Sequence, residues 1–237
     1  FNDEFTNYND TPIGIKAIIL LERLGVEVVI PKHLESARTY LSKGLLRQAR
    51  NIARTNVSLL ADIVSDERPL IGIEPSAILS FRDEYPELVG QDLRRKAEKL
   101  AKNVLTVEEY IASLWTKGKI DRELFESEER TIFYHGHCQQ KAISSTNAAR
   151  TILSIPAGWT VHEIPSGCCG MAGSFGYEKE HFEVSMKIGE LVLFPAVRNL
   201  DDDAIISASG TSCRHQIADG TGKNAMHPVE LLFEALI

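Results

Sequence analysis

The sequence predicts an α/β protein of two tandem, pseudo-symmetric βαβαβ repeats, each a small parallel sheet flanked by helices. Short apolar runs rich in β-branched residues alternate along the chain with longer segments of helical periodicity. The two halves also match in order, because residues 25–31 and 158–165 each lead from a glycine through an apolar run to a proline. Residues 73–77 similarly parallel residues 208–213 at their Ser-Ala and Ser-Cys ends. These matches indicate an internal repeat of about 130 residues.

The first half begins with two short elements and then becomes mainly helical. Residues 5–8 are expected to form a strand, and residues 12–24 a helix that Asp10 or Thr11 caps and Gly25 ends. The apolar run 26–30, closed by Pro31, is typical of a buried strand. The other elements expected here are helical segments over about 39–65, 77–82, 90–102 and 107–115, and a strand over 69–73.

The second half restarts the same pattern. The expected strands cover residues 130–134, 160–164 and 204–207, and the expected helices cover 139–154, about 177–200, and His227 to the end. The charged and polar stretch 121–129 marks the boundary between the halves. The sequence therefore predicts a first repeat over residues 1–124 and a second over residues 125–237.

Composition and charge exclude several classes of protein. Of 237 residues, 43% are hydrophobic and 25% are charged, which is typical of a globular protein with a sizeable core. The net charge of −7 argues against a nucleic-acid partner, which would require a basic surface. No apolar run approaches the length of a membrane span and no signal peptide is visible, so we expect a cytoplasmic location. Because the chain opens on Phe1 rather than Met, we expect a piece of a longer protein.

All four cysteines lie in the second half, which argues for a site rather than a disulfide framework. Each follows the end of an expected strand, and the carboxyl ends of parallel strands meet at one edge of a sheet. Four thiolates at one edge suit a soft-metal group, either an iron–sulfur cluster or zinc. The expected ligands are Cys138, Cys168, Cys169 and Cys213.

The spacing of these cysteines is unusual. The pattern Cys-x29-Cys-Cys-x43-Cys contains none of the Cys-x-x-Cys pairs of zinc ribbons and ferredoxins. Adjacent thiolates can each bind a different iron of one cluster, whereas binding a single ion together requires a strained ring.

The adjacent cysteines lie in a glycine-rich loop over residues 164–176. Its glycines recur every third residue, and Gly167, Gly170 and Gly173 are expected to bring the backbone close to a cofactor. A phosphate cradle at the start of the following helix is the alternative. However, the loop matches neither a Walker loop nor a dinucleotide fingerprint.

Three stretches of the second half carry a specific resemblance. These are HGHCQQK at 135–141, GCCGMAGSFG at 167–176 and GTSCRHQ at 210–216. They resemble the cysteine-rich CCG domain found in heterodisulfide reductase and in the iron–sulfur subunits of glycolate, lactate and glycerol-3-phosphate oxidoreductases. The likeness covers the whole chain, since that family carries two such repeats. The chain looks most like the C-terminal part of large FAD-linked oxidases.

The resemblance implies an iron–sulfur domain that passes electrons from a flavin towards a quinone or another carrier. It implies flavin and ferredoxin-type domains or subunits as partners, with FAD expected only in the full-length protein. A location peripheral to the inner membrane is then an alternative to a purely cytoplasmic one. It also places the Glu74-Pro75 turn near the site.

The departures from the family pattern predict a single site. Glu35-Ser36-Ala37 stands where the first repeat would have Cys-Cys-Gly, and Ala77 stands where it would have the thiol of Pro-Ser-Cys. The first repeat is therefore expected to pack over the second without ligating a metal. The second repeat lacks the final Cys-x-x-Cys of heterodisulfide reductase, which favours one four-cysteine cluster of the 4Fe-4S type.

Other interpretations remain open from the residues alone. Zinc suits four thiolates equally well and would make the domain a structural or assembly module without a redox role. The thiols could also be inert buried cysteines. His135, His137 and His215 are additional ligands or proton carriers in one interpretation, and loop histidines bonded to backbone in the other.

Overall fold

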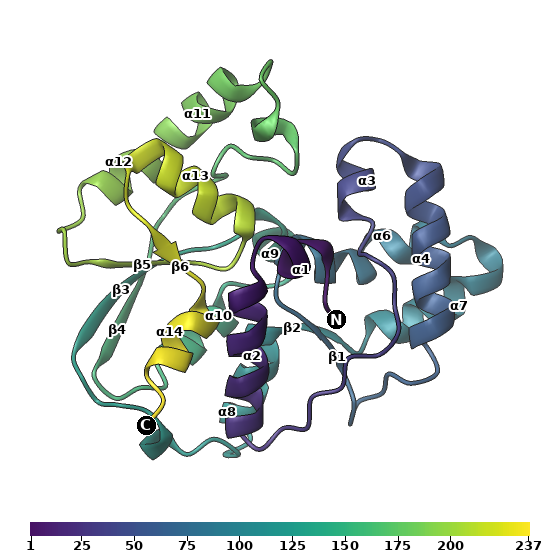
Figure 1. Ribbon diagram of the computed structural model, residues 1–237, viewed down its shortest axis with the longest axis horizontal. Helices are drawn as coiled ribbons and strands as arrows, with labels where there is room; N and C mark the ends of the chain where they lie inside the picture. The colour runs from purple at the N-terminus through teal and green to yellow at the C-terminus, as the bar shows by residue number, and fades with distance from the viewer.

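The computed structural model describes residues 1–237 and contains two parallel sheets flanked by helices (Figure 1). The first sheet pairs β1 (Leu70–Gly72) with β2 (Val104–Thr106). The second has four strands in the order β4-β3-β5-β6, with bounds of Trp159–Glu163, Arg130–His135, Ile205–Ala208 and Ala225–Met226. The predicted class, two small parallel sheets flanked by helices, is confirmed.

The register of the second sheet places its carboxyl ends together. Ile132 in the central strand β3 pairs with Val161 on one side and with Ile205 on the other, both in parallel. Since all three strands run the same way, the loops that follow them emerge at one edge. Each of those loops leads directly into a cysteine.

The helices of the first half cover most of its length. They are α1 (Glu4–Tyr8), α2 (Thr11–Arg23), α3 (Arg38–Ser42), α4 (Leu46–Leu60), α5 (Pro75–Ile78), η1 (Leu79–Phe81), α6 (Glu84–Leu88), α7 (Gln91–Ala101) and α8 (Val107–Thr116). Helix α8 begins with a capping box, in which Thr106 and Glu109 each bond the backbone amide of the other.

The second half alternates helices with its strands. Its helices are η2 (Arg122–Leu124), α9 (Cys138–Ile143), α10 (Asn147–Leu153), η3 (Phe175–Tyr177), α11 (Phe182–Glu190), α12 (Leu193–Arg198), α13 (Thr211–Thr221) and α14 (Pro228–Glu234). No helix of the chain combines the length and the apolar character needed to cross a bilayer.

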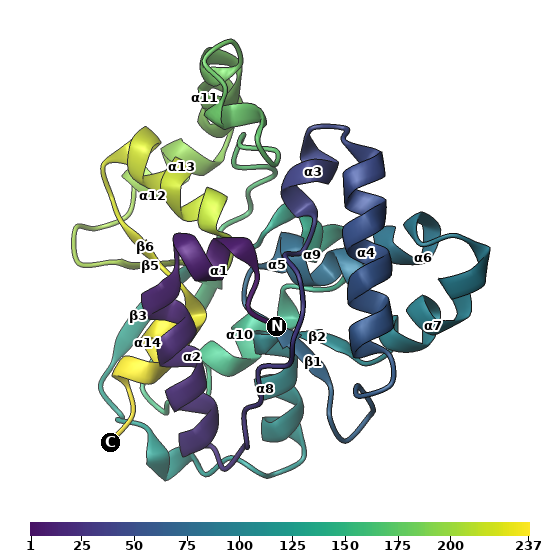
Figure 2. The ribbon, with the colours of Figure 1, turned by 45° about the vertical axis from the view of Figure 1, so that its right-hand side comes forward.

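The main hydrophobic core joins the two halves. Leu20 of α2 and Ile111 of α8 pack in one buried cluster with Ile132 of β3 and Leu232 of α14. Figure 2 shows α2 running beside α14 and α8, while α3, α4, α6 and α7 form a separate lobe with a core of its own. The first half therefore spreads over two lobes. The boundary at residues 124–125 stays a prediction.

Two strands predicted in the first half are wrong. Residues 5–8 lie in α1, because Asp3 accepts hydrogen bonds from the amides of Phe5 and Thr6 and caps a helix there. Residues 26–30 belong to no strand, and Val29 is 63% exposed.

The run 26–30 finds no strand partner in the first sheet. Leu70 faces β2, since its amide donates to Asn103, and successive residues of a strand bond to opposite sides. Ile71 therefore faces the other edge, where its carbonyl accepts from the amino group of Phe1. A β-branched run becomes a strand only where a neighbouring edge is free to pair with it.

The long predicted helices are interrupted. Gly44, with φ of 70°, divides the region 39–65 into α3 and α4. The segments 139–154 and 177–200 likewise split, into α9 and α10 and into η3, α11 and α12. Strands β2 and β6 were not predicted, because three and two residues are too short to show a periodic pattern.

Candidate metal centre

The four thiols lie at the carboxyl edge of the second sheet. The Sγ atoms of Cys213 and Cys169 lie 3.6 Å apart. Cys168 lies near both Cys169 and Cys138, close enough for these thiols to shift one another's pKa values. Cys169 and Cys213 are buried, whereas Cys138 and Cys168 are half-buried. The structure therefore brings together all four cysteines that the sequence singled out.

Three different elements position these thiols. Cys138 is the first residue of α9, directly after β3, and Cys213 lies in the first turn of α13, directly after β5. Cys168 and Cys169 come from the loop after β4, where the amide of Gly170 donates to Cys168 Sγ at 3.3 Å. A backbone donor of this kind favours the thiolate over the thiol.

The neighbouring sulfurs shift one another's pKa values in opposite directions. Hydrogen bonds from the Cys138 and Cys169 thiols lower the pKa of Cys168 to about 2. The contact with Cys169, with nearby His137 and His135, lowers the pKa of Cys213. The same contacts, together with burial, raise the pKa values of Cys138 and Cys169. The thiolate is the form that binds metal, so the lowered pKa values of Cys168 and Cys213 favour metal binding.

His135 is a buried histidine with one nitrogen facing the sulfurs. Its Nδ1 lies 2.6 Å from Ser166 Oγ, whereas its Nε2 is buried and has no hydrogen-bond partner. One ring nitrogen of His135 and the sulfurs of Cys169 and Cys213 all lie within 4.8 Å of one another. An orphaned buried nitrogen beside thiolates fits a metal ligand, or a donor to the sulfurs of a cluster. The donor set therefore fits a soft-metal group.

The other two candidate histidines have different surroundings. His137 caps α9, because its Nδ1 accepts from the amide of Gln139 at 3.1 Å, and its Nε2 lies 3.8 Å from Glu74 Oε1. His215 is exposed, and its Nδ1 lies 2.9 Å from the Tyr177 hydroxyl. Neither is among the residues whose ligand atoms gather within 4.8 Å.

Two of the three predicted glycines are required by the path of the loop. Gly170 has φ of 102°, and a Cβ there would lie 2.1 Å from the Ser185 carbonyl oxygen. Gly173 has φ of 70°, and a Cβ there would lie 2.7 Å from Ser42 Oγ on α3. Gly167 has an ordinary φ and open space around it. Gly170 and Gly173 thus fit the loop between α11 and α3, and contact between the three glycines and a cofactor stays a prediction.

The phosphate alternative loses its structural basis. It required a long helix to begin at Tyr177, directly after the loop. The structure has the 3-10 turn η3 there, and the next α-helix begins only at Phe182.

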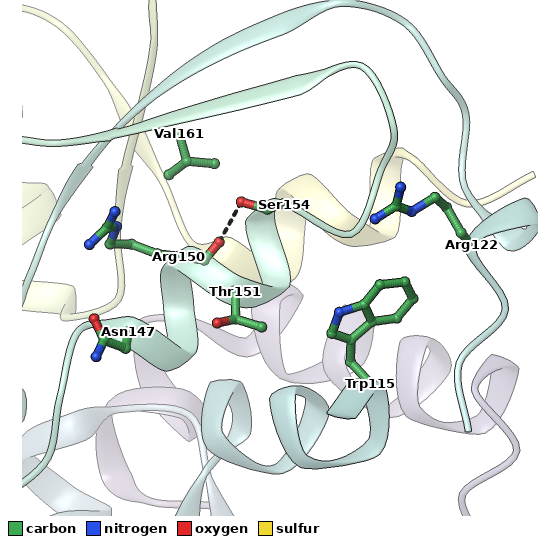
Figure 3. A pocket seen from close by; sticks show the side chains of 7 residues that line it. All are labelled: Trp115, Arg122, Asn147, Arg150, Thr151, Ser154 and Val161. Atoms are coloured by element: carbon green, nitrogen blue, oxygen red, sulfur yellow. Dashed lines mark hydrogen bonds between the residues drawn. The ribbon is translucent and has the colours of Figure 1, made fainter. Parts of the chain in front are cut away.

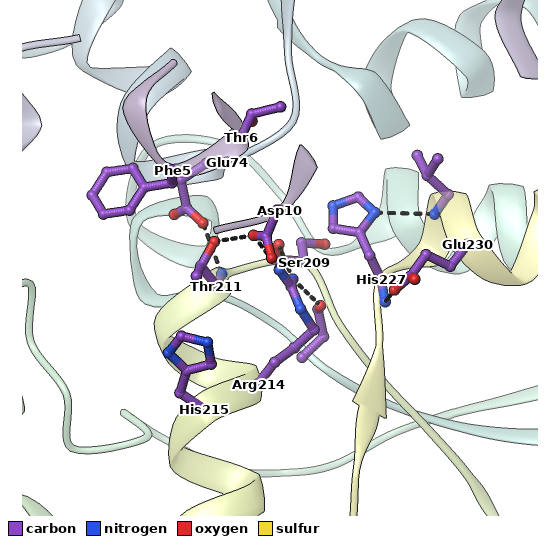
Figure 4. Close-up of polar contacts among 12 residues, drawn as sticks. Phe5, Thr6, Asp10, Glu74, Ser209, Thr211, Arg214, His215, His227 and Glu230 are labelled. Atoms are coloured by element: carbon purple, nitrogen blue, oxygen red, sulfur yellow. Dashed lines mark hydrogen bonds and ion pairs between the residues drawn. The ribbon is translucent and has the colours of Figure 1, made fainter. Parts of the chain in front are cut away.

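The first half contributes a buried carboxylate to the site (Figure 4). Glu74 is 3% exposed, and its Oε2 accepts from the Thr211 amide at 2.8 Å while its Oε1 accepts from Ser76 Oγ at 2.7 Å. Burial alone would raise the pKa of Glu74, but His137, these hydrogen bonds and Arg214 together lower it. An ionised Glu74 therefore fixes the first turn of α13, which carries Cys213. This agrees with the resemblance, which placed the turn near the site.

Asp10 is a second residue that the first half contributes to the site. The sequence indicates only that Asp10 can cap a helix, and contains no sign of this contact. Its Oδ2 accepts from the Thr211 hydroxyl and from the Arg214 guanidinium, as Figure 4 shows. Arg214 also donates to the carbonyls of Ala208 and Ser209, at 3.0 and 2.8 Å. Arg214 thus joins Asp10 of the first half to the end of β5.

The segment Glu35-Ser36-Ala37 keeps the shape expected of a degenerate Cys-Cys-Gly. Ala37 has φ of 64°, a left-handed conformation that glycine adopts more easily, and Gly170 has a positive φ at the matching position of the second half. Ser36 donates to Glu4 Oε1 at 2.8 Å instead of offering a sulfur. The backbone equivalence supports the internal repeat.

A cavity elsewhere in the molecule holds none of the cysteines (Figure 3). It has a volume of about 580 Å³ and lies between α8 and α10, lined by Trp115, Arg122, Asn147, Arg150, Thr151, Ser154 and Val161. A smaller cavity of about 310 Å³ adjoins Asp10 and Arg214. No predicted ligand residue lines the first cavity, and of the predicted ligands only His215 lines the second.

The fold and the grouping of cysteines with a histidine fit a metal-binding domain. Known proteins similar to this chain are dehydrogenases. The D-2-hydroxyglutarate dehydrogenase of Escherichia coli K12 is 28% identical over 99% of this chain, which corresponds to 22% of that protein. The protein of the same name from Haemophilus influenzae is 26% identical over 99% of this chain and 23% of its own length. One subunit of the anaerobic glycerol-3-phosphate dehydrogenase of E. coli K12 is 27% identical over 100% of this chain and 58% of its own length. No protein-family model matches the chain.

These comparisons confirm the resemblance to parts of larger oxidoreductases. The chain spans only 22% of the length of the first of these relatives and 58% of the glycerol-3-phosphate dehydrogenase subunit. It is therefore similar to one region of each protein.

Proposed function

We propose that the chain is the iron–sulfur region of a flavin-linked 2-hydroxyacid dehydrogenase and passes electrons from the flavin towards a quinone or another carrier. The observation that carries this proposal is the gathering of Cys169, Cys213 and His135 within 4.8 Å of one another, with Cys138 and Cys168 on neighbouring loops at the same sheet edge. The similarity to two kinds of dehydrogenase supports it. The chain would be one part of an enzyme, working with flavin and ferredoxin-type domains or subunits in the cytoplasm or at the inner membrane.

The residues of this chain would hold the cluster rather than perform the substrate chemistry. Cys138, Cys168, Cys169 and Cys213 would be its ligands, and His135 would be a fifth ligand or a donor to its sulfurs. Such a cluster, of the 4Fe-4S type, supplies one-electron chemistry when bound. Burial of Cys169 and Cys213 would exclude water from one side, while half-buried Cys138 and Cys168 would leave the other side close to the surface.

Zinc is the second candidate. Four thiols and one imidazole also suit a structural zinc site, which would join the loops without any redox role. The buried pair Cys169 and Cys213 favours this alternative, because a closed site is typical of structural zinc.

Anaerobic purification followed by iron, sulfide and zinc analysis and an absorption spectrum separates the two. We expect iron and sulfide together with a broad visible absorption band in the wild type, and loss of both in Cys168→Ala. Zinc in a stoichiometric amount that iron cannot replace on anaerobic reconstitution would refute the electron-transfer role.

Ser36→Ala is the control, because Ser36 lies in the degenerate segment at the position that corresponds to Cys169, next to the counterpart of Cys168. The substitution removes the hydrogen bond to Glu4 and should cost about 1 kcal/mol of stability. It should leave the metal content unchanged. Loss of metal in Ser36→Ala would show that Cys168→Ala reports unfolding rather than lost ligation.

A further inference from the structure

A line of four buried polar side chains runs from the first half to the edge of the thiol site. Glu108 of α8 is fully buried, and its Oε1 lies 2.5 Å from Ser209 Oγ. Ser209 Oγ lies 3.0 Å from the Tyr134 hydroxyl, which lies 2.7 Å from Gln140 Oε1. The chain Glu108–Ser209–Tyr134–Gln140 is thus continuous, and none of its members is more than 1% exposed.

The number of hydrogens in this chain can be counted. Three contacts require three hydrogens, one in each. The hydroxyls of Ser209 and Tyr134 supply one hydrogen each, and the amide oxygen of Gln140 supplies none. With Gln140 Oε1 facing Tyr134, the third hydrogen comes from Glu108, which then donates to Ser209, which donates to Tyr134, which donates to Gln140.

We propose that Glu108 is a neutral, protonated carboxylic acid at neutral pH and that, as the donor to Ser209, it positions the turn leading to Cys213. Ser209 follows β5 directly and begins the turn Ser209-Gly210-Thr211-Ser212 that ends at this cysteine. The first half would thus hold that turn with two glutamates in opposite states, an ionised Glu74 and a protonated Glu108. The inference stands whether or not the thiols carry a cluster.

No lysine or arginine forms an ion pair with Glu108, and the charge of Arg214 is directed to the carbonyls of Ala208 and Ser209 and to Asp10. The nearest titratable group is His227, whose Nε2 lies 3.8 Å from Glu108 Oε1. His227 Nδ1 accepts from the amide of Val229 at 3.0 Å, so its hydrogen lies on Nε2 and the ring is neutral. Burial, followed by the charge of Arg214, lowers the pKa of His227 well below its usual value.

The other charged neighbours also favour the neutral acid. Tyr134 and Glu109 also face Glu108, and the negative charge of Glu109 opposes a second one beside it. The second oxygen of Glu108, Oε2, is buried without any partner. A buried carboxylate whose second oxygen has no partner would be disfavoured. Burial accordingly raises the pKa of Glu108, although the contacts with Ser209 and Thr106 lower it.

Infrared spectroscopy of the protein tests the proton directly. The wild-type minus Glu108→Gln difference spectrum at pH 7 should contain the C=O band of a protonated carboxylic acid, which shifts in D2O. Carboxylate bands in its place would overturn the proposal. They would show that the Gln140 amide is turned, with its NH2 supplying the third hydrogen and the whole chain pointing the other way.

The pH dependence of unfolding gives a second, independent readout. The usual carboxyl pKa of 4.5 applies to the unfolded chain, so Glu108 would lose its proton only on unfolding at higher pH. The wild-type folding constant should therefore fall by up to about tenfold per pH unit above that value through this one group. In Glu108→Gln this part of the slope should vanish, because the amide keeps the donor without titrating.

The same variants separate positioning from simple packing. Glu108→Gln retains a donor to Ser209 and should fold and hold metal like the wild type. Glu108→Met fills the space without a donor to Ser209. The amount of zinc that this variant binds during dialysis against zinc should be at least tenfold lower than for the wild type. Equal retention in Glu108→Gln and Glu108→Met, or an unchanged pH slope in Glu108→Gln, would refute the role.

Discussion

His137 Nε2 lies 3.8 Å from Glu74 Oε1, and this pair joins the second half to the first at the thiol site. His137 Nδ1 accepts the Gln139 amide as the cap of α9, which leaves Nε2 facing the carboxylate. His227 and Glu108 repeat this arrangement at the start of α14, with the same 3.8 Å separation. The half without cysteines thus supplies buried carboxyl groups to the helices of the half that has them.

The first prediction concerns Glu74. Glu74→Ala leaves the Thr211 amide and His137 without their partner and should lower the free energy of unfolding by about 3 kcal/mol at pH 7. Because the folded-state pKa of Glu74 is lowered, its contribution is present above the unfolded value of 4.5 and is lost as pH falls through the folded pKa. Urea unfolding at a series of pH values should therefore show the difference from wild type shrinking in acid.

Glu98→Ala is the control for this experiment. Glu98 pairs with Arg94 on the surface, with both side chains about half exposed, so its loss should leave stability unchanged within error. A difference between wild type and Glu74→Ala that grows as pH falls would contradict the assignment of an ionised Glu74.

The second prediction separates two of the candidate histidines. His135→Gln replaces a buried nitrogen that faces Cys169 and Cys213, and should weaken metal binding by about 10- to 100-fold. His215→Gln changes an exposed ring bonded to Tyr177 and should leave binding unchanged. Competition with a chelator, followed by metal analysis of both variants, measures the difference. An equal loss of metal affinity in the two variants would show that His135 is not a specific part of the metal site.

The position of the thiols could be predicted because it depends on local features. Each cysteine follows a strand that is recognisable in the sequence, and parallel strands bring such positions to one edge. The loss of cysteines from the segment Glu35-Ser36-Ala37 was also visible, and the positive φ of Ala37 agrees with its place. These inferences needed only the chain order and the chemistry of single residues.

The contributions of the first half to the site depend on tertiary packing and could not be worked out from residue spacing. Asp10 meets Arg214 across 204 positions of the chain, and Ser209 meets Glu108 across 101. The helix and strand periodicities of a sequence do not indicate contacts between residues so far apart in the chain. Tertiary packing also explains why the strand predicted for residues 26–30 is absent. Their composition suits a strand. However, the sequence does not show that the carbonyl of Ile71, at the free edge of β1, already accepts a hydrogen bond from Phe1.

The third prediction tests the junction at Arg214. Its guanidinium donates to two carbonyls, of Ala208 and Ser209, and to Asp10, which a single ammonium cannot reproduce in the same geometry. Arg214→Lys should therefore cost about 2 kcal/mol of stability in urea unfolding. Arg94→Lys, at an exposed surface pair, is the control and should have no measurable effect. If both substitutions are equally tolerated, Arg214 does not join the halves.

The last prediction concerns the loop that carries Cys168 and Cys169. Gly170 has φ of 102°, and a Cβ would lie 2.1 Å from a backbone oxygen of α11, which cannot move aside without shifting the helix. Gly170→Ala should therefore cost about 3 kcal/mol or more and displace both thiols, with loss of bound metal. Gly167→Ala lies three residues earlier in the same loop, with an ordinary φ and nothing within 4 Å of the added carbon. It should keep both the stability and the metal, as thermal unfolding and metal analysis of the two proteins would show. Loss of metal from a fully stable Gly167→Ala would instead mean that this glycine approaches the cofactor, as the sequence predicts for all three glycines.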